Sequence, residues 1–413
     1  MPLARPPTPF IGGHFMRVPR RLTLVCAALA MLLLLAACGN DPEASGDGDA
    51  TEPSGETTDT TTTEEPTSAG ATESSDSIIP LDQVCEEEYA DVEAPDDFSV
   101  RLVTDIGSVD DGTFNQYANE GMQAAADCFG IDTDYIETAN EADYENNLNT
   151  ALEDDPNVVV TVGFLLADAT KEFAGDNPDV NFIGVDQFQE DYGDNYAGVL
   201  FREDQGGFLA GAMAGLLTES GTVGVVGGRE DVPPVVRLVN GYEMGAKHIA
   251  EENGEDVNVL KTYNESFTDK AKGRSDAEQM LGEGADVIFG AGGQTGSGGV
   301  QAAVESGAWG IGVDQDEYFT TFQGGEAQGV DKLATSAVKR VDLGVFENIA
   351  ATIQDRFEPG IFTLDAANEG ITYAPFHDAD IPEDVASKLE EIRQGLADES
   401  IDTGLDPVTG LPK

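Results

Sequence analysis

The chain has 413 residues, of which 79 are acidic and 21 basic, so its formal net charge is −58. A charge of this sign and size repels nucleic acid and anionic membrane surfaces, which excludes both as expected partners. The length leaves room for two domains of ordinary size. The acidity indicates a solvated acidic surface, or adaptation to high salt, where screening relieves the self-repulsion.

The first 37 residues have the pattern of a lipoprotein signal peptide. Basic residues precede an apolar run of 16 residues at 22–37, which is shorter than the roughly 20 residues of a membrane span and suits a signal sequence. The run ends Leu-Ala-Ala-Cys, similar to the lipobox of bacterial lipoproteins, so we expect a lipid on Cys38 and a location on the extracytoplasmic face of the cell membrane. An uncleaved anchor or an ordinary signal peptide is the alternative, and either Met1 or Met16 is the start.

Residues 38–80 are rich in Thr, Ser, Glu and Asp and contain too few apolar residues to fold, which predicts a flexible acidic linker. Beyond it, Cys85 and Cys128 are the remaining cysteines of a chain expected to be exported. A disulfide between them is one interpretation, and two free buried cysteines are the other.

An N-terminal lobe is predicted over residues 98–205. Short apolar runs alternate with helical patterns, which is typical of a parallel sheet covered on both faces. The predicted strands lie at 99–104, 133–136, 158–162, 182–185 and 197–200, and the predicted helices at 114–129, 141–152 and 167–174.

A C-terminal lobe is predicted over residues 206–331, opened by a helix of small residues at 206–217. Apolar residues at helical spacing predict a long helix at 332–356, which we expect to pack back on the first lobe. Residues 357–378 are assigned to the second lobe, and 379–413 to a C-terminal helix and tail. Further strands are predicted at 223–226, 257–263, 287–289 and 309–313, and further helices at 235–251 and 274–281.

The tetrapeptide Gly-Val-Asp-Gln occurs twice, at 184–187 and at 312–315. Each copy ends a strand–helix–strand pattern, so each places a carboxylate at the end of a predicted parallel strand. Open α/β sheets bind ligands at this edge. Two lobes with such edges facing each other predict a small ligand between them.

The segment 103–116 resembles the opening of the basic membrane protein family, the purine nucleoside receptor lipoproteins of bacterial ABC importers. The likeness continues at 206–215, 290–293, 312–315 and 335–342. It implies an α/β fold of the type I periplasmic-binding-protein kind, with two doubly wound parallel-sheet lobes joined by a hinge. It also implies that a nucleoside binds between the lobes.

Four first-lobe residues are candidates for the site. Phe114 follows a Gly-Thr turn and could stack on a flat base, or it is a core aromatic. Asn115 offers a donor and an acceptor that suit a purine edge, or it caps a helix. The resemblance implies that Asp186 bonds the base, and Asp105 either orders the loop or contacts the ligand.

In the second lobe, Asp314 would accept from both hydroxyls of a ribose, with Asp316 as the rival for this role. Either Asp186 or Asp314 could instead be a helix cap or a turn residue. Lys339, placed in the first turns of the long helix, would donate to ribose oxygens, or it is a solvated surface residue.

Phe267 could cover the other face of the base, with Tyr263 as its competitor. Gly292 and Gly293 would let backbone amides approach the ligand. The histidines are isolated in the sequence, so no metal cluster, catalytic triad or cofactor is expected.

The sequence therefore predicts a lipid-anchored solute-binding protein, expected to be a monomer, that delivers a purine nucleoside to the permease and ATPase of an ABC importer. Three alternatives remain at this point. They are the same fold binding a neutral sugar-like solute, a membrane-tethered sensor or regulator, and an enzyme such as a nucleoside hydrolase.

Overall fold

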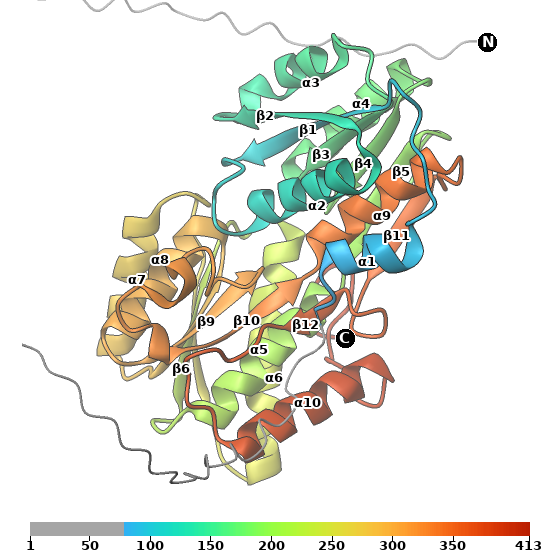
Figure 1. The fold of residues 1–413 in the computed structure, drawn as a ribbon. Coiled ribbons are helices and arrows are strands. Elements are labelled where there is room, and N and C mark those ends of the chain that lie inside the picture. Colours follow the sequence, from blue (N-terminus) through green and yellow to red (C-terminus); the bar gives the residue numbers. More distant parts are fainter. Residues whose placement is uncertain (1–77) are drawn as a thin grey trace, which may run out of the picture. The chain divides into compact units, whose positions relative to one another are not determined.

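The computed structural model describes residues 78–413, so the expected signal peptide, Cys38 and all but the end of the expected linker lie outside the described residues. The described part forms two α/β lobes, each built on a six-stranded sheet (Figure 1). Within it, no helix combines the length and the apolar character needed to cross a membrane.

The first sheet is parallel throughout, with the strand order β11-β5-β4-β3-β1-β2. Every residue of its central strand β3 is buried, as expected for a parallel sheet with helices on both faces. Its strands are β1 (Ser99–Ile106), β2 (Asp132–Thr138), β3 (Val158–Val162), β4 (Asn181–Val185), β5 (Tyr196–Phe201) and β11 (Gly360–Leu364). The helices of this lobe are α1 (Leu81–Glu88), α2 (Phe114–Phe129), α3 (Tyr144–Leu152), α4 (Ala167–Asp176) and α9 (Val341–Ile353).

The second sheet repeats this topology in the order β12-β10-β9-β8-β6-β7, with only β12 antiparallel to its neighbour. In both sheets the chain reverses direction across the sheet after its second strand, which creates a crevice at the carboxyl ends of the strands. The strands are β6 (Thr222–Gly227), β7 (Asn258–Thr262), β8 (Val287–Ala291), β9 (Trp309–Asp314), β10 (Leu333–Lys339) and β12 (Ile371–Tyr373). The helices are α5 (Glu203–Leu217), α6 (Pro233–Asn253), α7 (Lys270–Gly282), α8 (Gly293–Glu305) and α10 (Glu383–Ala397).

The chain passes between the lobes three times, and two of these crossings have the same construction. One runs from β5 through Arg202 into α5, and the other from β10 through Arg340 into α9. Each arginine binds the aspartate two residues later through two nitrogens, Asp204 at 2.7 and 2.8 Å and Asp342 at 2.9 and 3.1 Å. The third crossing is the segment between β11 and β12. These arginine–aspartate pairs fix the backbone where the lobes are joined.

The predicted helix at 332–356 is wrong over its first part, because residues 333–339 form β10. All seven residues of β10 are buried, and a strand buried on both faces has a continuous apolar run that also satisfies helical spacing. The helix begins only at Val341, since Arg340 has a non-helical backbone (φ −68°, ψ 64°). From there α9 packs on the first lobe, against α2 and the central strands.

The assignment of residues 357–378 to the second lobe is also wrong in part. β11 pairs with β5 and so belongs to the first sheet, whereas β12 pairs with β10 in the second. Strands this short, at the edge of a sheet, leave little periodic signal in the sequence.

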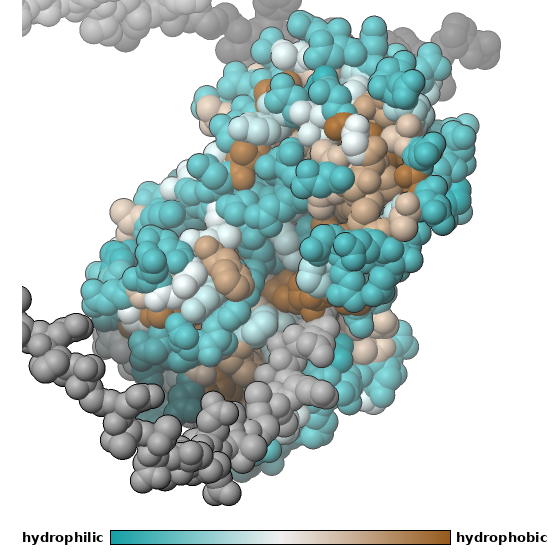
Figure 2. Space-filling view, viewed as in Figure 1, coloured by the Kyte–Doolittle hydropathy of each residue, from teal (hydrophilic) through white to brown (hydrophobic). Residues whose placement is uncertain are grey.

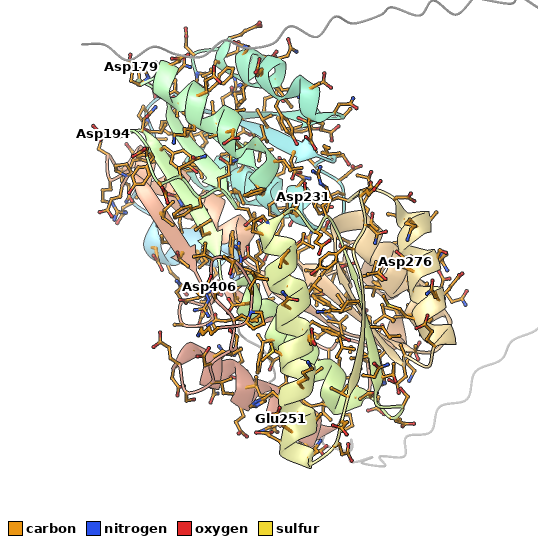
Figure 3. The ribbon with its side chains drawn as sticks, turned by 180° about the vertical axis from the view of Figure 1, so that it is seen from behind. Asp179, Asp194, Asp231, Glu251, Asp276 and Asp406 are labelled. Atoms are coloured by element: carbon orange, nitrogen blue, oxygen red, sulfur yellow. A yellow bond between two sulfur atoms is a disulfide. The ribbon has the colours of Figure 1, made fainter. Side chains whose placement is uncertain are left out.

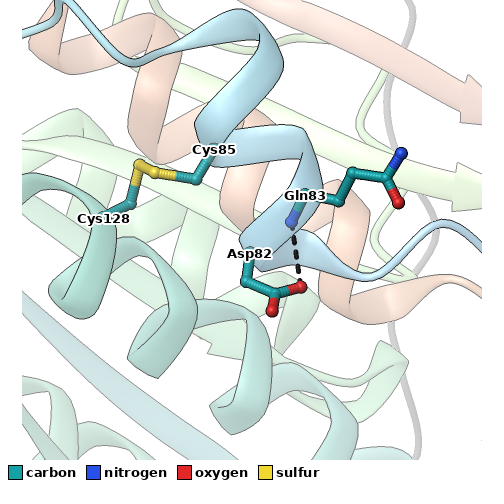
Figure 4. Close-up of a disulfide and its surroundings, with 4 residues drawn as sticks. All are labelled: Asp82, Gln83, Cys85 and Cys128. Carbon is teal, nitrogen blue, oxygen red and sulfur yellow. Dashed lines mark hydrogen bonds between the residues drawn. A yellow bond between two sulfur atoms is a disulfide. The ribbon is translucent and has the colours of Figure 1, made fainter.

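The structure extends the first lobe on its N-terminal side. The helix α1 precedes the predicted start of the fold near residue 98 and packs against α2 and α9. A disulfide joins Cys85 of α1 to Cys128 of α2, with 5.9 Å between their Cα atoms (Figure 4). The pair closes a loop of 43 residues and so restricts the unfolded chain.

The surface is polar and rich in carboxylates. The face shown in Figure 2 is mostly hydrophilic, and its apolar side chains gather in a few areas, the widest of them on the upper lobe. On the opposite side, Asp179, Asp194 and Glu251 are exposed (Figure 3). This arrangement agrees with a solvated acidic surface.

The helices α5 and α6 approach each other closely because glycines line their contact. A Cβ atom at Gly207 would lie 2.1 Å from the carbonyl oxygen of Leu238, and one at Gly211 would lie 2.0 Å from that of Tyr242. No side chain fits at such distances, so the small-residue pattern sets the separation of the two helices.

Gly211→Ala should therefore force α5 away from α6 and lower the free energy of unfolding by about 1–3 kcal/mol, the usual cost of overpacking. Gly175→Ala is the matched control, because Gly175 is exposed in α4 and a Cβ there meets nothing within 4 Å. We expect this control to be neutral or stabilising by up to about 1 kcal/mol. Chemical denaturation measures both, and equal stabilities would contradict the proposed packing constraint.

Candidate ligand site

A cleft lies between the carboxyl ends of the two sheets and contains about 640 Å³ of space not filled by protein atoms. That space includes solvent at the open mouth of the cleft, and the volume open to the centre of a water-sized molecule is about 70 Å³. The first lobe contributes Asp105, Ile106, Asp111, Phe114, Asn115, Phe164 and Asp186. The second lobe contributes Val232, Pro234, Val235, Leu238, Phe267, Thr268, Ala291, Gly292, Gly293, Gln294, Asp314 and Lys339. All nine residues predicted for ligand binding therefore lie in one cleft.

The two copies of Gly-Val-Asp-Gln place their aspartates in the same way. Asp186 follows β4 and Asp314 ends β9, and both have left-handed backbones, with φ of 60° and 67°. Aspartate tolerates this conformation better than most residues. The turn directs both carboxylates into the cleft from opposite lobes.

Lys339 is the cation at the centre of the site. It ends β10 rather than lying in a helix, and its side chain is only 4% exposed. Its Nζ donates to Oδ2 of Asp186 at 2.6 Å and to Oε1 of Glu203 at 3.3 Å. The expected alternative of a solvated surface lysine is therefore wrong, and this amine links the two lobes.

The same ammonium lies over two aromatic rings. Its Nζ is 4.7 Å from the ring centre of Phe114 and 4.9 Å from that of Phe201. Burial lowers the pKa of Lys339, but Asp186, Glu203 and Asp314 outweigh it and leave the pKa raised. The lysine thus stays charged at neutral pH.

Four carboxyl groups of the cleft have raised pKa values. Burial raises the pKa of Asp111, although hydrogen bonds from backbone amides oppose this. Burial raises the pKa of Asp105 to about 8, although a hydrogen bond from Asn115 opposes this. Burial also raises the pKa of Asp186 to about 7 and that of Asp314 to about 6, with Lys339 opposing in both cases.

The amide of Asn115 is oriented by two carboxylates. Its Nδ2 donates to Oδ1 of Asp105 at 3.1 Å and to Oδ2 of Asp111 at 3.2 Å, so both amide hydrogens are used. Its Oδ1 is buried and has no hydrogen-bond partner within residues 78–413, and the same holds for Oδ1 of Asp186. Contrary to the sequence prediction, Asn115 offers the cleft an acceptor only.

Asp111 is a part of the site that sequence reasoning missed. Its carboxylate accepts from the backbone amides of Thr113, Asn115 and Gln116 at 2.8–3.2 Å, which caps the start of α2. The same carboxylate holds the Asn115 side chain. Its position in the opening motif, four residues before Asn115, was the available signal.

For two of the predicted ligand contacts the sequence left two candidate residues each, and in each case only one of the two lines the cleft. Phe267 lines the cleft and Tyr263 does not. Asp314 lines it as well, whereas Asp316 is not among the lining residues and its Oδ2 lies 2.6 Å from Nε2 of His377.

Glycines shape the second-lobe wall next to Phe267. A Cβ at Gly292 would lie 2.3 Å from the amide nitrogen of Gly228, and one at Gly228 would lie 2.3 Å from the ring of Phe267. The Phe267 ring therefore packs directly on bare backbone, and α8 begins at Gly293 beside it.

Glu203 and Arg237 support the site from behind, and no sequence signal pointed to them. Glu203 is fully buried, and its Oε2 accepts from Nε of Arg237 at 2.6 Å while its Oε1 faces Lys339. The two residues are 34 positions apart and meet only because α5 packs on α6.

The lobes also touch directly around the cleft. Nε2 of Gln315 donates to the carbonyl of Thr113 at 2.9 Å, and Oγ1 of Thr320 donates to that of Gly112 at 2.8 Å. Within residues 78–413, no group of three or more His, Cys, Asp or Glu side chains is arranged to hold a metal ion. The cleft thus combines three aromatic rings, several acceptors and one cation, a set that suits a flat polar solute with its own donors.

Comparison with known proteins places this chain in a family. Residues 98–392 match the Bmp family, described as ABC transporter substrate-binding protein PnrA-like. The chain belongs to this family. It is therefore an ABC transporter substrate-binding protein, as the resemblance of its opening motif predicts.

Individual relatives agree. The chain is 34% identical over 322 residues to a CD4+ T-cell-stimulating antigen of Listeria innocua, covering 74% of this chain and 87% of the relative. It is 32% identical over 291 residues to the ABC transporter nucleoside-binding protein BmpA of Lactococcus lactis, covering 67% and 81%. Among solved structures, an ABC transporter solute-binding protein of Aeropyrum pernix superposes with a TM-score of 0.66 at 25% identity, covering 74% and 92%. The predicted type I fold is confirmed.

The carboxyl pKa values predict a pH dependence of stability. A folded pKa of about 8 for Asp105, against an ordinary value of 3.8, means that the folded chain binds more protons than the unfolded chain between these values. Stability of the ligand-free protein should then fall as pH rises from 4 to 8, by at most about 1.4 kcal/mol per pH unit for one proton.

Asp105→Asn should reduce this slope without abolishing it, because Asp186 and Asp314 titrate in the same interval. Asp331→Asn, which changes an exposed carboxylate, should keep the original slope. Urea denaturation at several pH values measures the slopes. An unchanged slope in Asp105→Asn would show that Asp105 is not the group responsible.

Proposed function

We propose that this protein is the lipid-anchored, extracytoplasmic receptor of an ABC importer and that its ligand is a purine nucleoside. The observation that carries the proposal is the pairing of Phe114 and Phe267, one from each lobe, in a cleft whose buried side-chain atoms without a partner in residues 78–413 are acceptors. The nucleoside-binding relative BmpA supports the same ligand class. Relatives named lipoproteins or basic membrane proteins support the anchor on Cys38.

The base binds in the aromatic part of the cleft. Phe114 and Phe267 stack on its two faces, at about 1–3 kcal/mol per stacked base. Oδ1 of Asn115 and Oδ1 of Asp186 accept from its polar edge, which satisfies two acceptors that are otherwise buried without partners. Asp105 acts through Asn115, whose amide it orients.

The ribose binds at the charged end. Asp314 makes no side-chain hydrogen bond to residues 78–413, so both its oxygens can accept from the 2′ and 3′ hydroxyls. Lys339 donates its remaining hydrogen to a ribose oxygen. Gly292 and Gly293 bring backbone close to the sugar without a side chain in between.

Binding then drives closure of the lobes. A ligand that contacts both lobes stabilises the closed form by its greater affinity for that form, and the closed form docks on the permease. The protein acts as a monomer that binds its solute without chemical change and touches the membrane only through its lipid.

The two unpaired acceptors of the cleft require a base that carries hydrogen-bond donors, and this can be tested with a set of nucleosides. Guanosine, inosine and adenosine carry N–H donors on the base edge, whereas purine riboside has the same rings and sugar but no such donor. Calorimetric titration of residues 39–413 should show binding of the first three and a loss of at least about tenfold for purine riboside, since two buried acceptors would stay unpaired. Ribose and galactose should not bind. Tight binding of a free sugar would instead support the sugar-binding alternative.

Two site variants test the assigned roles against matched controls. Phe114→Ala and Asp314→Ala should each weaken guanosine binding by about 1–3 kcal/mol. The controls are Phe319→Ala, which removes a ring that is 64% exposed, and Asp316→Ala, which removes the carboxylate bonded to His377. Both controls should bind guanosine as the original chain does. Unchanged affinity in a site variant would remove that residue from the ligand contacts.

A further inference from the structure

The C-terminal segment 403–413 is folded onto the region where the lobes join. It turns back on itself, with a bridge between Leu405 and Pro412 and a hydrogen bond from the amide of Lys413 to the carbonyl of Gly404 at 3.0 Å. Leu405 is 1% exposed and Thr403 is 1% exposed. The family match ends at residue 392, so this segment lies beyond the part of the chain that the family shares. Figure 3 labels Asp406 within it.

Its contacts are concentrated on the first turn of α5. Oγ1 of Thr403 donates to Oδ2 of Asp204 at 2.6 Å, and Asp204 is the partner of Arg202 at the first crossing. The adjacent Gln205 is held by the carbonyl of Leu396, at the end of α10. The C-terminal part thus contacts the residues through which the chain enters the second lobe.

A second set of contacts reaches the ligand site through Arg237. The carbonyl oxygen of Val408 accepts from Nη1 of Arg237 at 2.7 Å, while Nε of the same guanidinium donates to Glu203. The backbone of Gly410 packs on the Arg237 side chain so closely that a Cβ there would lie 2.8 Å from its Cγ. The segment therefore fixes both ends of this arginine side chain.

We propose that residues 403–410 position the cation of the ligand site through the chain of contacts Val408–Arg237–Glu203–Lys339. The physical reason is competition for the ammonium of Lys339. Arg237 neutralises Glu203 and holds it at 3.3 Å from Nζ, so Lys339 stays close to Asp186 at 2.6 Å. Without the Val408 carbonyl, Arg237 can turn toward solvent, and Glu203 then attracts Lys339 away from the cleft. The segment itself touches no ligand; it is a positioning element.

Gly410→Ala tests this inference. Gly410 has φ 69°, and a methyl group there would push the segment off Arg237. The control is Gly254→Ala at the end of α6, which has φ 70° and nothing within 4 Å of a Cβ, so it carries the same backbone strain without the contact. We expect guanosine affinity to fall about tenfold in Gly410→Ala, within the range for members of one ion-pair network, and less than about twofold in Gly254→Ala.

A double-mutant cycle identifies the route. Glu203→Gln removes the charge that connects Arg237 to Lys339 while keeping the shape of the side chain. In that background, Gly410→Ala should cost little further affinity. Additive losses would overturn the proposed route, and wild-type affinity in a destabilised Gly410→Ala protein would reduce the segment to a structural role.

The inference rests on the proposed nucleoside ligand, so one readout is independent of any ligand. In the ligand-free protein, amide hydrogen exchange across the start of α5, at residues 203–207, should be faster in Gly410→Ala than in Gly254→Ala. If the unsubstituted chain binds no nucleoside but this difference appears, the proposed function fails while the hold of the segment on the start of α5 stands. Equal exchange in the two variants contradicts the positioning role alone.

Discussion

The buried ammonium of Lys339 is the interaction that joins the two lobes at the ligand site. It ends a strand of the second sheet and binds a carboxylate at the edge of the first, so it is at once an inter-lobe contact and a member of the ligand site. Several carboxyl groups lie in the same small volume, and their mutual repulsion and burial are opposed mainly by this cation. Removing one partner of such a buried pair is costly because the other is left as an uncompensated charge. A change to any one of the charged residues around Lys339 therefore affects the stability of the others.

The sequence specifies most of the scaffold because its signals are local. The strand at 158–162 and the helix at 114–129 were predicted with the boundaries that the structure has, since a run of β-branched residues and a turn followed by helical spacing are each contained in a short segment. The strand at 333–339 was not, because burial on both faces removes the alternation that distinguishes a strand from a helix. Its pairing partner in the second sheet is a matter of tertiary structure and cannot be read from its own residues.

The same distinction applies to the site. The residues at strand ends and in the opening motif could be found from the sequence, because strand ends of parallel sheets converge and Gly-Val-Asp-Gln occurs twice. The hydrogen bonds that those residues make, and hence what they offer a ligand, could not be found from the sequence. Asn115 offers only an acceptor because Asp105 and Asp111 take both its amide hydrogens, and this follows from side-chain positions that no spacing rule gives. Arg237 and Glu203 were missed for the same reason, since their meeting depends on how α5 packs on α6.

The distribution of cations gives the composition a structural meaning. Only 21 residues are Lys or Arg, yet four of them lie at the junction of the lobes or directly behind the cleft, namely Arg202, Arg237, Lys339 and Arg340. Each binds a carboxylate there, and three of the four carboxylate partners are on α5 or α9, the helices that follow the crossings. An acidic chain that repels itself over its surface is thus held together by ion pairs at the junction of its lobes. Exposed pairs are screened by salt whereas buried ones are screened much less, so salt weakens the buried pairs at this junction less than the pairs on the surface.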